Sequence, residues 1–375
     1  MATFSEKVKL LRGLLTGKTA YVGPFFVLVD ITRRCNLQCL GCRSHSSQMS
    51  TSQIDSSIPP DISFDLFEKL CHELKTMDTR AIVLIGDGEP LLHDRIFEMI
   101  SIAKASGFHT TLVTNGTLLD RRTIQALFDS HLDILRVSLW AGSAETYEKN
   151  YPGAPLDSFN KVVESVTLMN SLKANRHLKQ PCVILHHPLN RHNFEKIETF
   201  LELALTAKCD GVSFSPFYTW RGALASSALS PAEEQSLLLS LEKIEKRLQS
   251  LRLSHNIGQT RVQYRIGKQV WQKIPCYIGW IHARVKTDGT ILPCNRCDIP
   301  LGNLKTNSFQ DIWNGFPYRS FRRQTSTRKG LASLIRDCDC EYCCFIKDNL
   351  RIHRLFRWAS PFQSHPRKEE GCSKN

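Results

Sequence analysis

The chain has 375 residues, of which 42% are hydrophobic and 23% are charged, and these proportions are typical of folded globular proteins. They exclude collagen-like, coiled-coil and disordered classes, and the length allows two or three domains. No apolar run approaches the ~20 residues of a membrane helix, and the N-terminus lacks a signal-peptide core, so we expect a soluble cytoplasmic protein. Two values are unusual: the formal net charge is +13, and there are 14 cysteines.

The cysteines are grouped rather than scattered. Because the cytosol keeps thiols reduced, we do not expect them to form disulfides. Three lie together near the N-terminus and seven in the last third of the chain; these are Cys35, Cys39, Cys42, Cys276, Cys294, Cys297, Cys338, Cys340, Cys343 and Cys344. Such clustering indicates metal binding.

Residues 1–24 hold one amphipathic pattern, over 4–16, with a basic face opposite the apolar one. It predicts a helix that covers the next domain, with contact to an anionic membrane surface as the alternative. From residue 25 to residue 228, strand-like and helix-like segments alternate. Strands are predicted over 25–31, 81–86, 109–114, 134–139, 182–186 and 211–217, and helices over 64–75, 95–106, 120–130, 159–172 and 194–208. This order predicts an α/β fold in which a parallel sheet curls into a partial (β/α)6 barrel.

The alternation stops after residue 228. Ser230, Pro231 and Glu233 have the spacing of a helix N-terminal cap, and we expect a bridging helix within 229–262 that ends near Leu253. Residues 263–347 are rich in cysteines and turns, which predicts a small α+β module. Residues 348–375 are predicted to form a basic tail.

The first cysteine group follows the first predicted strand directly. Cys35, Cys39 and Cys42 have the spacing CxxxCxxC, and three thiolates are one fewer than a closed zinc site or a fully ligated 4Fe–4S cluster needs. The group therefore suggests a 4Fe–4S cluster with one iron open to an outside ligand, at the end of a strand where βα barrels carry their chemistry. A zinc loop completed by His45 is the alternative.

This motif resembles the signature of the radical S-adenosylmethionine (SAM) enzymes, and the next strand ends contain further resemblances. The turn after the second strand resembles the one that holds the methionine amino group of SAM, with Glu89 accepting from the ammonium; it comprises Gly86, Asp87, Gly88, Glu89 and Pro90. Asn115 and Ser138 end the third and fourth strands, where the family places polar contacts to SAM; a plain turn and a strand-end hydroxyl are the alternatives. Gly41 departs from the pattern, because the family usually has an aromatic residue there, packed near the adenine.

The second group can supply a closed site. Twelve residues, Gly289 and four more residues separate its first two cysteines, and a CxxC follows, which suits zinc or iron–sulfur; the four candidates are Cys276, Cys294, Cys340 and Cys343. A predicted hairpin with an Asp288-Gly289 turn presents Cys294. Together with 301–304 and 311–314, it resembles the SPASM and twitch auxiliary-cluster modules. We expect the twitch arrangement with a single auxiliary 4Fe–4S cluster. Cys297, Cys338 and Cys344 stay unassigned, either as structural or alternative ligands or as part of a second, irregular cluster.

The resemblance implies an enzyme that cleaves SAM reductively to a 5′-deoxyadenosyl radical, which abstracts a hydrogen atom from a substrate carbon. The auxiliary cluster would assist net oxidation or bind the substrate. Residues 1–24 leave no room for a peptide-recognition domain, so we expect a small-molecule substrate, sugar-like or phosphorylated given the charge of +13. That charge also suits an acidic electron donor of the flavodoxin or ferredoxin type.

Three alternatives remain open at this point. The first is a peptide- or protein-modifying radical SAM enzyme or maturase, because relatives with auxiliary clusters include enzymes that modify peptides. A nucleic-acid-modifying enzyme is allowed by the basic charge, although no RNA-binding module is recognisable. A non-enzymatic metal-binding scaffold would have no use for a SAM-holding turn. The sequence singles out no catalytic side chain, and it predicts a SAM site completed within residues 25–228.

Overall fold

The computed structural model describes residues 3–48, 57–219, 222–251, 253–334, 337–340 and 342–359. One ten-stranded sheet runs through it in the order β10-β9-β8-β1-β2-β3-β4-β5-β6-β7. Its strands are β1 (Phe26–Asp30), β2 (Ala81–Ile85), β3 (His109–Thr114), β4 (Ile134–Ser138), β5 (Cys182–Leu189), β6 (Gly211–Pro216), β7 (Ser254–His255), β8 (His282–Val285), β9 (Thr290–Leu292) and β10 (Gly302–Asn303). Neighbours from β8 to β7 pair in parallel, whereas β9 pairs antiparallel with both β8 and β10.

Helices alternate with these strands and follow them. The α-helices are α1 (Phe4–Thr16), α2 (Phe64–Thr76), α3 (Ile96–Ala105), α4 (Arg121–Asp129), α5 (Ala144–Asn150), α6 (Ser158–Asn175), α7 (Ile197–Thr206), α8 (Pro231–Leu251), α9 (Ile257–Ile266), α10 (Phe309–Trp313), α11 (Phe316–Thr325), α12 (Arg328–Ser333) and α13 (Ile346–Ala359). Short 3-10 turns are η1 (Pro90–Leu92), η2 (Phe194–Lys196), η3 (Ala225–Ser227), η4 (Gly267–Gln272) and η5 (Ile278–Trp280).

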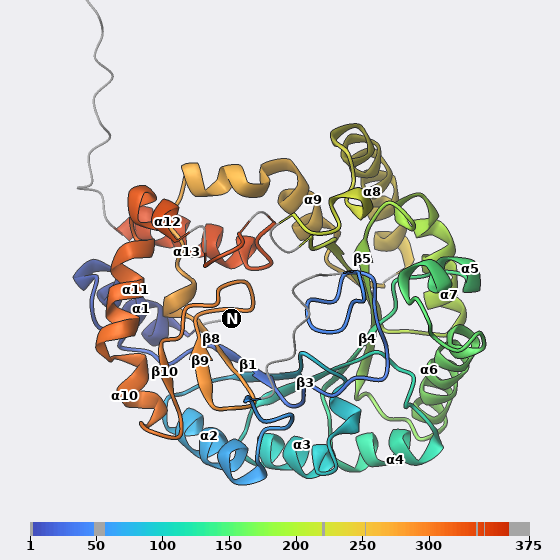
Figure 1. Cartoon of the computed structure of the whole chain (residues 1–375), viewed down its shortest axis with the longest axis horizontal. Coiled ribbons are helices and arrows are strands. Elements are labelled where there is room, and N and C mark those ends of the chain that lie inside the picture. Colours follow the sequence, from blue (N-terminus) through green and yellow to red (C-terminus); the bar gives the residue numbers. More distant parts are fainter. Residues whose placement is uncertain are drawn as a thin grey trace, which may run out of the picture.

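The six predicted strands and five predicted helices of the barrel half are confirmed, with ends shifted by a few residues. Figure 1 shows β1 to β6 as an arc with the helices on its outer side. Helix α2 shows why these segments form helices. Ser63 caps its N-terminus, and buried side chains recur every three or four residues, as in Phe67, Leu70 and Leu74. This spacing places one apolar stripe against the sheet. The sheet does not close, because β10 and β7 end it within the described residues.

The cysteine-rich region does not form a separate sheet. Its first strand, β8, pairs in parallel with β1, with Phe26 opposite His282 and Leu28 opposite Arg284. The predicted hairpin is confirmed: β8 and β9 pair antiparallel, and Gly289 takes a left-handed φ of 86° that favours glycine. The C-terminal third therefore extends the barrel sheet beyond its first strand.

The region 229–262 contains more than the single bridging helix that its pattern predicts. Helix α8 ends at Leu251, and β7 then pairs with β6 before α9 begins. Asn256 stabilises this break, since its side chain accepts from Phe214 N at 2.7 Å and donates to Phe214 O at 2.8 Å. A side chain that replaces backbone partners in this way leaves no periodic signal in the sequence.

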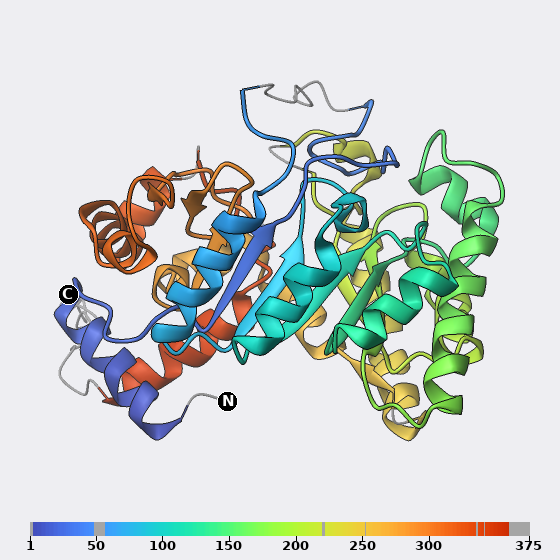
Figure 2. The same cartoon turned by 90° about the horizontal axis from the view of Figure 1, so that it is seen from below.

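The two ends of the described chain lie side by side. Figure 2 shows α1 and α13 packed against each other below the C-terminal module. Of the predicted basic tail, residues up to 359 form the last part of α13, and 360–375 lie outside the described residues. No helix in the described ranges combines the length and the apolar character that crossing a membrane requires.

Candidate active site and metal centres

The first cysteine group lies in the loop that follows β1, at the end of the sheet that carries the carboxyl termini of the parallel strands. Figure 2 shows this loop rising from the end at which the β1 arrow points. Cys35, Cys39 and Cys42 are half-buried. Two turns shape their segment, because Cys42 N donates to Cys39 O at 3.0 Å and Ser46 N donates to Cys42 O at 3.2 Å. Catalytic loops of βα barrels occupy this end of the strands.

The three thiols lie close enough to influence one another. Burial raises the pKa of each, and the pKa of Cys39 is raised further by its neighbours Cys42 and Cys35. Thiolates are the ligands of iron–sulfur clusters, and bound metal ions compensate their charge. A buried set of thiols that oppose one another's ionisation therefore fits an iron–sulfur cluster.

The zinc alternative finds no support in this loop. Its fourth ligand would be His45, whose Nε2 donates to Arg33 O at 2.9 Å, which leaves Nδ1 as the ring nitrogen available to a metal. Among the described side chains, no three of His, Cys, Asp or Glu are placed as a single metal ion would need.

Gly41 stands where the resemblance leads us to expect an aromatic side chain. A Cβ at this position would lie 2.6 Å from Cε2 and 2.8 Å from Cζ of Phe217, well inside van der Waals contact. Phe217 follows β6, is 4% exposed, and donates its backbone N–H to Leu189 O at 3.0 Å. A ring from the end of β6 thus packs against Gly41 in the space next to the motif.

The turn after β2 packs backbone against backbone on the cysteine loop. A Cβ at Gly88 would clash with Arg34 O, and a Cβ at Gly86 would clash with Thr32 O, so both positions need glycine. Glu89 N also donates to Arg34 O at 2.8 Å. The segments that the sequence assigns to the cluster and to SAM are therefore in direct contact.

The carboxylate of Glu89 is hydrogen-bonded to groups inside the protein. Its carboxylate accepts from Thr114 Oγ1 at 2.7 Å, from Asn115 N at 2.6 Å and from Leu91 N at 3.0 Å, and the side chain is 1% exposed. Burial raises its pKa, while the three hydrogen bonds oppose the rise. Glu89 also caps the short helix that Pro90 begins. The contact to the SAM ammonium stays a prediction, and the role that the geometry supports is to hold the turn to the end of β3.

Asn115 and Ser138 have partners too. Asn115 Nδ2 donates to Asn36 Oδ1 in the cysteine loop at 2.9 Å, and its Oδ1 accepts from Thr117 N at 2.9 Å. Ser138 Oγ accepts from the indole N–H of Trp140 at 2.9 Å. Asn115 therefore ties the end of β3 to the cysteine loop, whereas Ser138 belongs to a neighbouring strand end, and their contacts with SAM stay predictions.

We expect Glu89→Gln to lower the free energy of unfolding by about 1.5–3 kcal/mol and to weaken SAM binding, because the amide nitrogen cannot accept and leaves a buried donor unpaired. Denaturant unfolding and isothermal titration measure the two effects. Glu98→Gln is the matched control, since Glu98 has a 56% exposed side chain on α3. An unchanged stability of Glu89→Gln would show that the carboxylate does not hold the turn.

Asp87 belongs to a buried ionic triad that joins the turn to the C-terminal strand. Arg284 on β8 donates Nε to Asp30 Oδ2 at 3.0 Å and Nη2 to Asp87 Oδ1 at 2.9 Å. Burial raises the pKa of Asp30 to about 6 although Arg284 opposes the rise, whereas Arg284 and Lys286 outweigh burial and lower the pKa of Asp87. A residue outside the barrel half therefore anchors the turn to which the SAM contact is assigned, and the expectation that the barrel half completes the SAM site by itself stays a prediction. The signal in the sequence was a charged residue between the apolar residues Ala283 and Val285.

A second ion pair joins the same two regions. Arg43, next to Cys42, donates Nη1 and Nη2 to the two carboxylate oxygens of Asp298 at 2.8 Å and 3.0 Å. Asp298 directly follows Cys297 in the C-terminal third. The loop of the first cysteine group is thus held to the region of the second group by a bidentate pair.

The second cysteine group is brought together from three segments. Burial raises the pKa of Cys343, and the largest further contributions come from Cys344 and Cys340, followed by Cys276 and Cys294. Cys344 was not assigned from the sequence, yet it also raises the pKa values of Cys294 and Cys340. Five thiols, three buried and two half-buried, therefore lie near one another, one more than a single cluster requires.

One expectation about the cysteines is wrong. Cys297 and Cys338 form a disulfide, with Cα atoms 4.0 Å apart. Isolated antiparallel β-bridges pair Cys294 with Cys297 and Cys297 with Cys338. The two chain segments are therefore neighbours through their backbones as well. This contact could not be predicted from the sequence, because the two cysteines are 41 residues apart.

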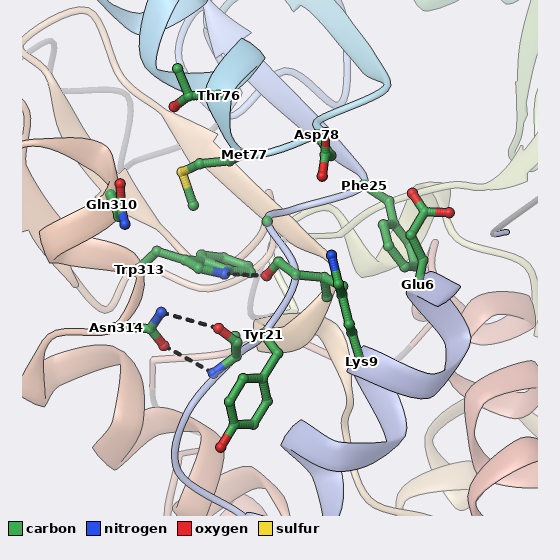
Figure 3. Close-up of a pocket in the computed structure, with 13 residues that line it drawn as sticks. Glu6, Lys9, Tyr21, Phe25, Thr76, Met77, Asp78, Gln310, Trp313 and Asn314 are labelled. Atoms are coloured by element: carbon green, nitrogen blue, oxygen red, sulfur yellow. Dashed lines mark hydrogen bonds between the residues drawn. The ribbon is translucent and has the colours of Figure 1, made fainter. Parts of the chain in front are cut away.

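A cavity of about 180 Å³ lies away from all of these residues. Figure 3 shows its lining, in which Asn314 bonds to the backbone of Ala20 and the Trp313 indole donates to Val22 O at 2.8 Å. Phe25 and Met77, at the amino ends of β1 and β2, also line it. It therefore lies at the end of the strands opposite the cysteine loop and is separate from the candidate site.

Comparisons with known proteins agree with this geometry. Residues 29–204 match the model of the radical SAM superfamily, and residues 276–344 match that of the SPASM iron–sulfur cluster-binding domain. An AdoMet-dependent heme synthase of Methanosarcina barkeri (strain Fusaro / DSM 804) is 25% identical over 336 residues, which cover 85% of this chain and 89% of the relative.

Solved structures share the fold at low sequence identity. Streptococcus suis SuiB bound to its precursor peptide SuiA gives a TM-score of 0.65 at 14% identity, with 89% of this chain and 78% of SuiB covered. The enzyme anSMEcpe with bound AdoMet gives 0.62 at 16% identity, with 90% and 97% covered. The chain therefore contains a radical SAM domain and a SPASM domain and is an enzyme whose cofactors are a 4Fe–4S cluster, SAM and auxiliary iron–sulfur of the SPASM type.

Proposed function

We propose that Cys35, Cys39 and Cys42 hold the 4Fe–4S cluster that binds SAM. The observation that carries this proposal is the direct packing of the cysteine loop on the turn at 86–90, with backbone contact at both glycines. Asn115 reinforces it through Asn36. When bound, the reduced cluster and SAM supply radical hydrogen-abstraction chemistry.

The residues of this chain hold the site in shape. Glu89 fixes the turn to the end of β3 through three accepted hydrogen bonds, and Phe217 packs on Gly41. A bound SAM molecule would lie against the turn and the strand ends, with polar groups of Asn115 and Ser138 near it. Preorganised partners of this kind reduce the cost of ordering the site on binding.

We propose further that Cys276, Cys294, Cys340 and Cys343 hold one auxiliary 4Fe–4S cluster, with Cys344 as an alternative ligand. The mutual effect of these thiols on their pKa values supports their proximity. This site would accept an electron from the substrate or help to bind it. Hydrogen bonds and burial around the sulfur atoms would tune its potential.

A small molecule is the substrate class that we favour. The relative from Methanosarcina barkeri, which matches 85% of this chain, is named as a synthase of heme, a small molecule. The net charge of +13 favours a substrate that carries negative charge, and it also favours docking of an acidic flavodoxin- or ferredoxin-type electron donor.

Replacing Cys340 and Cys343 together by alanine is expected to halve the iron content, from about eight to about four atoms per chain, because one of two cubic clusters loses half of its ligands. SAM cleavage with dithionite should persist. The measurement is iron analysis after anaerobic reconstitution, with circular dichroism to show that the variant is folded.

The matched control is Cys182→Ala/Cys209→Ala, which removes two thiols outside both groups and should keep the full iron content. If the folded Cys340/Cys343 variant also keeps about eight irons, these cysteines do not hold the auxiliary cluster. If the unaltered chain reaches only about four, the two-cluster proposal itself is refuted.

A further inference from the structure

The concave side of the barrel has one polar wall. Along β4 and β5, alternate side chains are fully buried, as in Leu135, Val137 and Leu185, and these pack on the helix layer because successive strand residues point to opposite faces. The half-buried set between them faces the space that the curled sheet encloses. On β4, β5 and β6 this set begins with Ile134, Cys182 and Ile184 and is polar towards the strand ends, where it comprises Arg136, Ser138, His186, Ser213 and Ser215.

Arg136 is the unusual member of this wall. It makes no hydrogen bond or ion pair with any residue in the described ranges, and its Nε is buried without a partner. Desolvation lowers its pKa, and no nearby carboxylate opposes the effect. Arg136 is half-buried as a residue, and a desolvated charge without a counter-charge is destabilising.

The buried arginines of the described chain each have a counter-charge or an aromatic ring beside the guanidinium, although Arg296 Nη1 and Arg322 Nη2 are buried without a hydrogen-bond partner. Arg284 lies between two aspartates. Arg322 donates Nε to Gly279 O at 2.8 Å and packs over aromatic rings that include Trp313. Arg296 lies 3.5 Å from the ring centroid of Tyr218. Arg136 has neither a counter-charge nor an aromatic ring.

The neighbours of Arg136 are donors or neutral groups. His186, on the adjacent strand, has its pKa lowered to about 3 by burial and then by Arg136, so it is neutral near pH 7. Its Nδ1 lies 2.9 Å from Ser213 Oγ and its Nε2 3.4 Å from Ser215 Oγ. The imidazole therefore lies between the positive charge on β4 and the two hydroxyls on β6.

The position of Arg136 relates this group to the candidate active site. Ser138 ends β4, and Arg136 precedes it by two residues, which is roughly 6–7 Å along a strand. Arg136 therefore lies below the mouth of the barrel, whereas the cysteine loop lies at the mouth. A molecule held at Arg136 would extend towards the strand ends where the cluster and SAM are proposed to bind.

We propose that Arg136, with His186, Ser213 and Ser215, binds an anionic group of the substrate inside the barrel. A guanidinium matches the geometry of a carboxylate or a phosphate through two parallel N–H donors. Because neutral His186 accepts from one of the two serine hydroxyls and donates to the other, that second hydroxyl is free to donate to a ligand. The inference deepens the proposed function, on which it rests, by assigning the substrate class a negatively charged group.

The test uses the reconstituted full chain and two probes, inorganic phosphate and acetate, at an ionic strength kept constant with chloride. Isothermal titration and thermal unfolding report binding. We expect at least one probe to bind the unaltered chain and to raise its Tm, and Arg136→Met to weaken that binding by about tenfold or more. Without a probe, Arg136→Met should unfold at a higher temperature than the unaltered chain, because a desolvated charge without a counter-charge is removed.

Arg247→Met is the matched control, because it removes one positive charge from an exposed pair with Glu198 and should leave probe binding unchanged. The preferred probe distinguishes a phosphorylated substrate from a carboxylate. Equal probe binding by the unaltered chain and Arg136→Met, binding of neither probe, or a lower Tm of the probe-free variant would overturn the inference. Failure of the proposed function shows separately, as an unaltered chain that forms no 5′-deoxyadenosine.

Discussion

Replacing Cys39 by alanine should abolish the formation of 5′-deoxyadenosine, which is the largest effect on activity that we expect. Cys39 is the middle ligand of the proposed cluster, and its loss leaves two thiols where three are needed to hold a cube with one open iron. The variant should stay folded, because the side chain is half-buried in a loop rather than part of a strand or helix.

The measurement is product formation from SAM with dithionite under anaerobic conditions, together with iron analysis. Cys71→Ala is a stringent control, because Cys71 is 1% exposed in the core of α2, far in sequence from both cysteine groups, and should retain SAM cleavage. Continued formation of 5′-deoxyadenosine by a folded Cys39→Ala variant would mean that this loop does not hold the catalytic cluster.

The largest effect on stability is expected from Arg284→Met, which should lower the free energy of unfolding by about 3–5 kcal/mol. The substitution leaves two carboxylates without their cation. Asp30 is 1% exposed, and its pKa is already raised to about 6 while Arg284 is present. Removing one member of a buried ionic group costs more than the group contributes, since the remaining charges are still desolvated.

The same variant should bind SAM more weakly, because Asp87 in the turn loses its anchor on β8. Arg284→Lys provides a graded comparison: it keeps the charge but cannot donate to both aspartates with the fixed fork of a guanidinium. Arg247→Met again serves as the exposed control and should cost less than about 1 kcal/mol. Chemical denaturation and isothermal titration give the two values, and a fully stable Arg284→Met would show that the triad contributes nothing.

The alternation of strands and helices was determined by the sequence alone. Apolar residues at helical and strand spacing predicted β1 to β6 and their helices within a few residues, because side-chain burial repeats every 3.6 residues in a helix and every two in a strand. The cysteine loop and the turn at 86–90 were also predicted from the sequence, because each is a short motif whose residues lie within a few positions of one another.

Only the tertiary structure decided which distant residues complete the site. Arg284 meets Asp30 across 254 residues of sequence, and the ring of Phe217 lies on Gly41. Both contacts follow from strand placement: β8 joins the sheet beside β1, and β6 ends at the same edge as the cysteine loop. Local periodicity predicts that a strand forms, but the choice of its neighbour depends on the packing of the whole sheet, which no short stretch of sequence encodes.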